Sequence, residues 1–332
     1  RTTVHRGVTM AARFAPLERE YLAANKQAAL FDRSHRGLIV ARGGDRKTWL
    51  NNLITNVVAT LGDNEGSYAF ATDVKGRTQF DLNVLSAPSE LLLDVDRLIT
   101  PDAQAHLERF LITEDVELEI VSDAFARIGC SGPQANRVAK SLGVENFTPM
   151  PSLSSVAIAG GDVRLFRHDF AGQPGFELIV PAREAVIWWD RLIADCGVTP
   201  CGIDTAEVLR IEAALPAWGA DIDGAVIPPE TGQIERGISY HKGCYLGQEV
   251  IERMRSHGSL GRRLTRFVMD DGQGLTPPLP ITRDAKQAGR ITSLAQHPSG
   301  ERWIALGYLR TSITDPDGLT VGDPPRPIRV AG

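Results

Sequence analysis

The spacing of apolar segments changes near residue 258, and this change most constrains how the chain can fold. Before it, longer apolar stretches alternate between helical and strand-like periods. After it the apolar segments are short and are separated by glycine and proline, at 264–269, 289–294, 303–309 and 328–330. Short strands with Gly/Pro turns are typical of a small all-β module. We therefore place a domain boundary at residues 255–262 and predict a C-terminal β-barrel over 258–332.

The preceding 257 residues are too long for one ordinary core and predict two further units, at 1–125 and 126–257. Periodicity predicts helices at 12–31, 45–54, 101–110, 134–142, 183–194 and 205–215. Strands are expected at 38–40, 68–72, 78–85, 91–95, 116–121, 126–130, 156–159, 163–168 and 176–180. Strands with helices returning across them predict an α+β fold.

Charge and cysteine content exclude several classes of function. The net charge of −5 gives no strong case for a nucleic-acid partner. No apolar run reaches the roughly 18–20 residues that span a bilayer, so we expect no membrane association. The first residues do not resemble a signal peptide, and Met10 is a possible start, so we expect a cytoplasmic protein. Four cysteines are too few for a disulfide framework, and no His/Cys spacing predicts a metal site.

A loop rich in glycine and proline leads into an apolar strand at 176–180, and Glu177 lies inside that strand. A carboxylate in an apolar run is costly to bury unless it is paired or binds something. Strand alternation equally allows Glu177 to face water. The residue is therefore a candidate for binding, with a solvent-facing acid as the alternative.

This loop resembles that of the glycine-cleavage T-protein and related folate-dependent demethylating enzymes. Their pattern is Tyr-x-Gly-Glu-x-Gly-aromatic-Glu, and the matching residues here are Phe170, Gly172, Gly175, Phe176 and Glu177. The resemblance implies that Glu177 holds the pterin of tetrahydrofolate, because a carboxylate accepts two parallel N–H bonds from a guanidine-like edge. It also implies that Phe170 lies along the pocket wall. Phe170 replaces the tyrosine of the pattern, and Gln173 replaces the first glutamate.

Two further segments extend the resemblance in the same order along the chain. Residues 30–37 match Leu-Phe-Asp-x-Ser-His-x-Gly, and residues 209–222 are similar to a Leu-Arg-Leu-Glu-Ala-Gly segment that ends in Gly-x-Asp. The likeness covers most of residues 15–250. It implies a three-lobed fold, in which two α+β lobes and a small C-terminal β-barrel surround a folate pocket.

The octapeptide from Lys242 to Glu249 departs from the T-protein and resembles the YgfZ-type branch of the same superfamily. Its Lys-Gly-Cys-Tyr-Leu-Gly-Gln-Glu sequence replaces a Lys-Gly-Asp-Phe-Ile-Gly-Arg-like segment. The YgfZ-type proteins bind folate and support iron–sulfur enzymes, which implies iron–sulfur client or assembly proteins as partners. Lys242 would favour the thiolate of Cys244. The alternative for a lone cysteine is a small buried apolar residue.

An enzymatic activity stays open from the sequence. The T-protein uses an aspartate near its folate, and Asp102 falls at the corresponding place, with Asp96 as the neighbouring alternative. An acid early in a helix is also explained by the helix dipole alone. Ala206 stands where the T-protein has an arginine. Our main hypothesis is therefore a YgfZ-type tetrahydrofolate-binding protein for iron–sulfur cluster assembly or repair. The alternatives are an aminomethyltransferase, with Asp102, Lys242 and Cys244 as catalytic candidates, and a scaffold that binds no folate.

Overall fold

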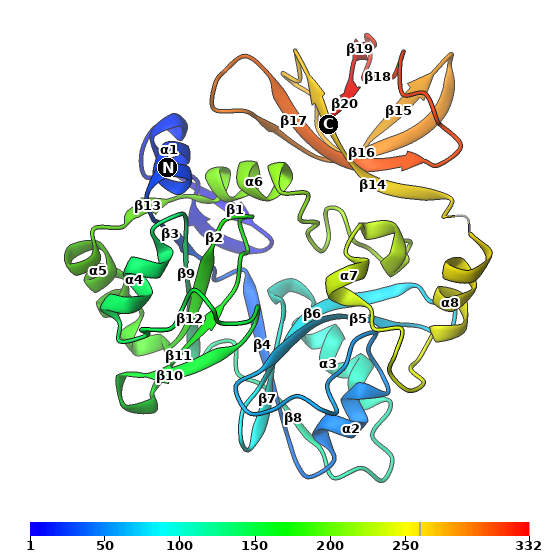
Figure 1. Ribbon diagram of the computed structural model, residues 1–332. Helices are drawn as coiled ribbons and strands as arrows, with labels where there is room; N and C mark the ends of the chain where they lie inside the picture. The colour runs from blue at the N-terminus through cyan, green and yellow to red at the C-terminus, as the bar shows by residue number, and fades with distance from the viewer. Residues whose placement is uncertain (259, 332) are drawn as a thin grey trace.

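The computed structural model describes residues 1–258 and 260–331. Ser259, within the predicted boundary at 255–262, and Gly332 lie outside the described residues. Two α+β lobes and a β-barrel are grouped around a common centre (Figure 1). The predicted α+β fold with a C-terminal β-barrel is confirmed.

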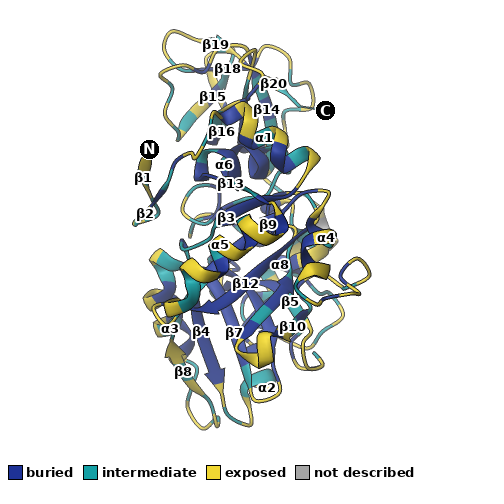
Figure 2. Ribbon diagram, turned by 90° about the vertical axis from the view of Figure 1, so that its left-hand side faces the viewer, coloured by how far each residue is buried: buried dark blue, intermediate teal, exposed yellow. Residues whose placement is uncertain are grey.

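The first lobe is built on a five-stranded antiparallel sheet. Its strands run in the order β5 (Gly66–Thr72), β6 (Thr78–Ser86), β7 (Glu90–Asp96), β4 (Arg36–Arg42) and β8 (Glu117–Ile120). Alternate apolar residues of these strands pack under helices α2 (Arg46–Asn51) and α3 (Thr100–Glu108). Residues on the opposite face pack against the second lobe. Both faces are thus buried along most of β4, β6 and β7, whereas the edge strand β8 is largely exposed, as Figure 2 shows for β4, β7 and β8.

The second lobe holds a six-stranded sheet. The order is β10 (Ser155–Ile158), β11 (Val163–Arg167), β12 (Gly175–Pro181), β9 (Phe125–Ser131), β3 (Ala29–Asp32) and β13 (Thr199–Cys201). Helices α4 (Ala135–Ser141) and α5 (Ala185–Cys196) cover one face. Ile179 on β12 lies in the core shared with the first sheet, so Glu177, two residues before it, is on the side that faces the first lobe.

The seven-stranded C-terminal barrel packs on α6 (Ile203–Glu212). Its order is β19 (Arg326–Pro327), β18 (Thr320–Val321), β15 (Leu279–Arg283), β16 (Lys286–Gln296), β17 (Trp303–Arg310), β14 (Arg262–Met269) and β20 (Arg329–Val330). Val208 and Ile211 of α6 contact Ile304 and Leu306 of β17 through a small apolar cluster. This contact fixes the barrel against the two lobes.

The remaining elements connect the lobes. They are the hairpin β1 (Thr2–His5) and β2 (Val8–Ala11), α1 (Leu17–Lys26), α7 (Ile234–Gly237) and α8 (Gln248–His257). The helix predicted over 12–31 is wrong at its end, because residues 29–32 form β3 between β9 and β13. A short apolar run fits helix or strand equally well, and here pairing within the second sheet decides. Among the described residues, no helix has the length and apolarity needed to span a bilayer.

Candidate functional site

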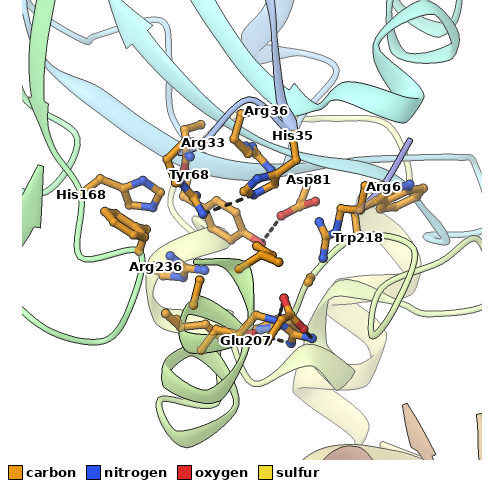
Figure 3. A pocket seen from close by; sticks show the side chains of 18 residues that line it. Arg6, Arg33, His35, Arg36, Tyr68, Asp81, His168, Glu207, Trp218 and Arg236 are labelled. Atoms are coloured by element: carbon orange, nitrogen blue, oxygen red, sulfur yellow. Dashed lines mark hydrogen bonds and ion pairs between the residues drawn. The ribbon is translucent and has the colours of Figure 1, made fainter. Parts of the chain in front are cut away.

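Residues from the two sheets, the turn of the β1–β2 hairpin, α6 and α7 line a common cavity. Its lining is rich in charge: five arginines (Arg6, Arg33, Arg36, Arg210 and Arg236) and two acids (Asp81 and Glu207). Aromatic walls come from Tyr68, Phe170 and Trp218. Figure 3 shows the labelled side chains of this lining around one space, with Arg33, Tyr68 and Asp81 on one side and Glu207 on the other. The cavity therefore offers flat apolar surfaces beside hydrogen-bonding groups, as sites for small polar ligands do.

Asp81 is the buried acid of this cavity. It lies on β6, where Phe80, Leu82 and Val84 point to the helical side of the sheet, so Asp81 and Asn83 point to the other side. The Tyr68 hydroxyl donates to Asp81 Oδ2 at 3.0 Å. Among the described residues, Oδ1 of Asp81, Oδ1 of Asn83 and Nδ1 of His35 have no hydrogen-bond partner, although all three atoms are buried. Burial raises the pKa of Asp81, and the charge of Arg36 opposes this rise.

A chain of buried charges crosses from the first sheet to the second. Arg127 on β9 donates through Nη1 to Asp94 Oδ1 at 2.7 Å and through Nη2 to Glu177 Oε2 at 2.8 Å. Arg36 donates through Nε to Asp94 Oδ1 at 3.0 Å. The Arg127 side chain is 3% exposed, and those of Asp94 and Glu177 are fully buried. These pairs therefore connect the two sheets in a region from which water is excluded.

Glu177 is paired, as the sequence required of a buried acid. His168 Nδ1 lies 2.6 Å from Glu177 Oε1, and Arg33 Nε lies 3.4 Å from Oε2. Burial opposes ionisation of Glu177, but the charges of Arg33 and Arg127 offset it and hold its pKa well below the ordinary value. The residues that line the cavity include His168, Arg33 and Phe170, whereas Glu177 lies behind them. Phe170 lies in the cavity wall, whereas the predicted contacts of Glu177 and Phe170 with folate stay a prediction.

Lys242 and Cys244 lie away from the central cavity. Lys242 Nζ donates to the backbone carbonyls of Asn51, Ile54 and Asn56 at 2.5–2.7 Å, near the C-terminal end of α2. Burial lowers the pKa of Lys242 to about 7. Three acceptors match the three N–H groups of the ammonium form, so this side chain anchors the segment that carries Cys244. Cys244 itself is exposed, in a groove with Val74 and other residues from 244–249.

The two aspartates considered from the sequence occupy different places. Asp102 is exposed in the first turn of α3, and it lines a separate cavity with His106 and Arg109. Asp96 accepts a hydrogen bond from the Leu98 backbone N–H at 3.0 Å and pairs with Arg6 at 2.6 Å. Neither aspartate lines the central cavity, although Trp218 lies in the lining of both cavities.

The barrel supports the cavity without lining it. Arg210, which lines the cavity, donates to Asp221 Oδ2 and to Ser293 Oγ, both at 2.8 Å. Tyr308 Oη donates to the Asp221 carbonyl at 2.8 Å. Ser293 and Tyr308 belong to the barrel strands β16 and β17. The position of Arg210 in the cavity wall therefore depends on contacts with the third lobe.

The family model for the GCVT N-terminal domain matches residues 3–239 of the chain. The chain belongs to this family. An aminomethyltransferase of Rubrobacter xylanophilus is 27% identical over 328 residues, which cover 98% of this chain and 87% of that protein. One of Geobacillus thermodenitrificans is 29% identical over 314 residues, covering 92% and 86%. The crystal structure of the glycine cleavage system aminomethyltransferase T from Bartonella henselae covers 100% of this chain and 93% of its own, with a TM-score of 0.87 and 19% identity.

Membership of the GCVT family confirms the predicted T-protein superfamily. The family uses tetrahydrofolate, which confirms the predicted cofactor. The YgfZ-type branch and its iron–sulfur partners stay predictions, and the relatives reported above carry the name aminomethyltransferase. No group of three or more potential metal ligands occurs within residues 1–258 and 260–331.

Sequence reasoning missed Asp81, Arg33 and Arg127. A signal for Asp81 was present, because Asp81 and Asn83 alternate with the apolar residues of a predicted strand, as Glu177 does in its own strand. Arg33 lies inside the segment 30–37, whose pattern indicates the family but gives no role to the arginine. Arg127 carries no comparable signal, because an arginine at the start of a predicted strand is ordinary.

We expect the substitution Lys242→Met to loosen the octapeptide. It removes three hydrogen bonds and leaves three carbonyls without this partner, which costs about 2–3 kcal/mol when such groups are buried. Urea unfolding measures the loss, and limited proteolysis should show faster cleavage within 240–249. Lys75→Met, at an exposed lysine, is the matched control. Equal stability of the two variants would contradict the anchoring role.

Proposed function

We propose that this protein catalyses folate-dependent aminomethyl transfer in the central cavity. The name carried by relatives that cover nearly the whole chain supports this reaction. The observation that carries the proposal is the Asp81 carboxyl group, buried in the cavity with one oxygen hydrogen-bonded to Tyr68 and the other without a partner among the described residues. A buried acid with a free oxygen is suited to exchange a proton with a bound substrate.

The residues present fit tetrahydrofolate. This molecule has N–H groups on its reduced ring and on the bridge to its benzoyl group, and the free oxygens of Asp81 and Asn83 are acceptors for such groups. Its flat rings match the aromatic walls. Its glutamate carboxylates match Arg236, whose guanidinium lies 4.0 Å from the Tyr68 ring centre and which takes part in none of the ion pairs found among the described residues.

Aminomethyl transfer requires proton movement at nitrogen. The methylene carbon of the donor forms bonds to two folate nitrogens, while its bonds to the amine and to the donor's carrier group break. The amine leaves as ammonia and the carrier group leaves in its protonated form, so that the two protons lost by the folate nitrogens are taken up by these leaving groups. Asp81 can accept such a proton at Oδ1 while Tyr68 holds Oδ2. The raised pKa of Asp81 brings the carboxyl group closer to the working pH, which improves a general acid–base group.

The test uses the full chain and two measurements. Titration with folinate, a stable reduced folate, should change the intrinsic fluorescence and raise the melting temperature. An aminomethyl donor with tetrahydrofolate should then yield methylenetetrahydrofolate and ammonia in equal amounts. No change in fluorescence or melting temperature at saturating folinate would show that the protein does not bind folate. Binding without product would remove the transfer reaction.

A second candidate function rests on Cys244. All four cysteines are free, and Cys244 alone is exposed whereas Cys130, Cys196 and Cys201 are buried. Free thiols are usual in a reducing compartment, which supports a cytoplasmic location. An exposed thiol on an anchored segment, within an octapeptide of YgfZ type, favours a role with iron–sulfur client or assembly proteins.

Replacement of Cys244 by alanine separates the two functions. Under the transfer proposal, Cys244→Ala keeps full aminomethyl-transfer activity, because the thiol lies outside the cavity. Under the second proposal, the variant fails to restore iron–sulfur enzyme activity in a strain that lacks the native protein. Full restoration by Cys244→Ala would exclude the thiol from that role, and Cys201→Ala, at a buried cysteine, is the matched control.

A further inference from the structure

Arg33 stands between Glu177 and the cavity. It follows β3 directly, and its guanidinium carbon lies 4.4 Å from the ring centre of Phe170. Its Nη2 is 3.5 Å from Glu177 Oε1, and its Nε is 3.4 Å from Oε2. Arg33 lines the cavity, and Figure 3 shows it beside His35 and Tyr68. The guanidinium therefore covers the carboxylate on its cavity side and packs on an aromatic ring at the same time.

The contacts of Arg33 are looser than those of its neighbour on the same carboxylate. Arg127 reaches Glu177 at 2.8 Å and Asp94 at 2.7 Å, close to the ordinary length for charged pairs. Among the described residues, every polar contact of the Arg33 side chain, including 3.3 Å from Nη1 to His35 Nε2, is longer than 3.2 Å. Its Nε has no hydrogen bond among the described residues. Of the two arginines that contact Glu177, Arg33 therefore makes the longer and weaker contacts.

Glu177 has a closer cationic partner than Arg33, although the charge of Arg33 also lowers the pKa of its carboxyl group. One carboxylate carries one negative charge, and the Arg127 guanidinium already supplies a positive charge at short distance. His168 occupies the second carboxylate oxygen at 2.6 Å. Arg33 also lies near the positive charges of Arg36 and Arg127, and burial together with these charges lowers its pKa. A second buried cation at this place costs desolvation energy that its long contacts recover poorly.

We propose that Arg33 occupies a binding position for a flat, guanidine-like ring edge, and that a ligand presenting such an edge to Glu177 displaces it. A guanidinium and the amino-pyrimidinone edge of a pterin both offer two parallel N–H groups to a carboxylate. Both are also flat and pack on an aromatic face. Glu177 and Phe170 therefore contact Arg33 through a carboxylate and an aromatic ring, and the same two groups would contact a pterin. This inference rests on the proposed folate-dependent function, and it makes Arg33 the residue that sets affinity for the pterin.

Displacement has a measurable cost. The apparent dissociation constant equals the intrinsic constant divided by the fraction of molecules in which the position beside Glu177 and Phe170 is free. Arg33→Met removes the competing guanidinium and keeps an unbranched apolar side chain beside Phe170. We expect the dissociation constant for folinate to fall roughly tenfold in this variant. A folinate analogue that lacks the exocyclic amino group of the pterin should bind no more tightly to Arg33→Met than to wild type, because it cannot offer both N–H groups.

The experiment measures folinate and analogue binding to wild type, Arg33→Met and Arg33→Gln by calorimetry, with melting temperatures to verify folding. Tighter binding of folinate to the variants than to wild type, without tighter binding of the analogue, supports the inference. Unchanged or weaker binding in both variants overturns it, because Arg33 would then be a wall residue or a direct ligand contact. An equal gain for the analogue also overturns it, since the substitutions would only enlarge the cavity. No binding by any protein overturns the proposed function as well.

Discussion

Replacing Asp81 by asparagine is expected to lower the rate of aminomethyl transfer by roughly 10²–10⁴-fold while folinate still binds. Asparagine keeps the size of the side chain and the hydrogen bond with Tyr68, but it cannot take up a proton. The loss should therefore appear in kcat, with a small change in KM. Stopped assays of methylenetetrahydrofolate formation measure it, and folinate titration shows that the cavity is intact.

The pH profile gives a second measure of the same group. Burial raises the pKa of Asp81 above its ordinary value, so the carboxyl group is protonated over a wider acidic range than an exposed aspartate. As a proton acceptor it works in the ionised form. The wild-type rate should fall as the pH drops through this raised pKa, and Asp81→Asn should lack that acidic limb.

Asp102→Asn decides between the two aspartates. Asp102 is exposed at the start of α3 and lines a different cavity, so we expect this variant to retain activity. If Asp102→Asn abolishes transfer and Asp81→Asn does not, the assignment from the cavity is wrong and the prediction from the sequence stands.

Replacing Arg127 by methionine is expected to lower the free energy of unfolding by about 3–5 kcal/mol. The change leaves Asp94 without one of its two arginines and leaves Glu177 with the long contacts of Arg33 and a histidine. Removing one cation from a buried network is costly because the remaining carboxylates stay buried without that partner and without water. Urea denaturation measures the loss. Arg191→Met, which removes an exposed pair with Asp195, should cost less than about 1 kcal/mol.

Acid should weaken the same network. Burial opposes ionisation of Asp94, but Arg127 and Arg36 lower its pKa to about 2. The pKa of Glu177 is also depressed, so both carboxyl groups bind protons more readily in the unfolded chain than in the folded one. Their contribution is fully present above the ordinary carboxyl range and is lost as the pH falls through the folded values. Arg127→Met should therefore show a shallower loss of stability between about pH 4 and pH 2. An equal acid sensitivity in the variant would contradict this account.

Local patterns predicted the elements well where one period dominated. The C-terminal module followed from short apolar segments and Gly/Pro turns, and these segments are strands of the barrel. Leu30 and Phe31 show the limit of such patterns, because they fit the end of a helix as well as a strand. In the structure both are buried in β3, which pairs with β9 and β13 from distant parts of the chain.

The candidate site was likewise predictable from the sequence only in part. The apolar run around Glu177 left two expectations open, a carboxylate that is paired or binds something and an acid that faces water, and in the structure Glu177 is buried and paired. The identity of its partners could not be predicted, because Arg127 and Arg33 lie 50 and 144 residues away along the chain. Lys242 was predicted to act on the thiol of Cys244, whereas the structure shows its Nζ hydrogen-bonded to three backbone carbonyls at the C-terminal end of α2 and just after it.

The sequence by itself determined the α+β and barrel classes and the family, because periodicity, turn residues and motifs are properties of short segments. Tertiary structure alone decided that Asp81 lies in the central cavity, that Asp102 lies outside it and that Arg33 covers Glu177. These outcomes depend on which strand faces meet when the two sheets pack. Such packing joins residues with no local relation, and the cost of burying their charges then selects the partners.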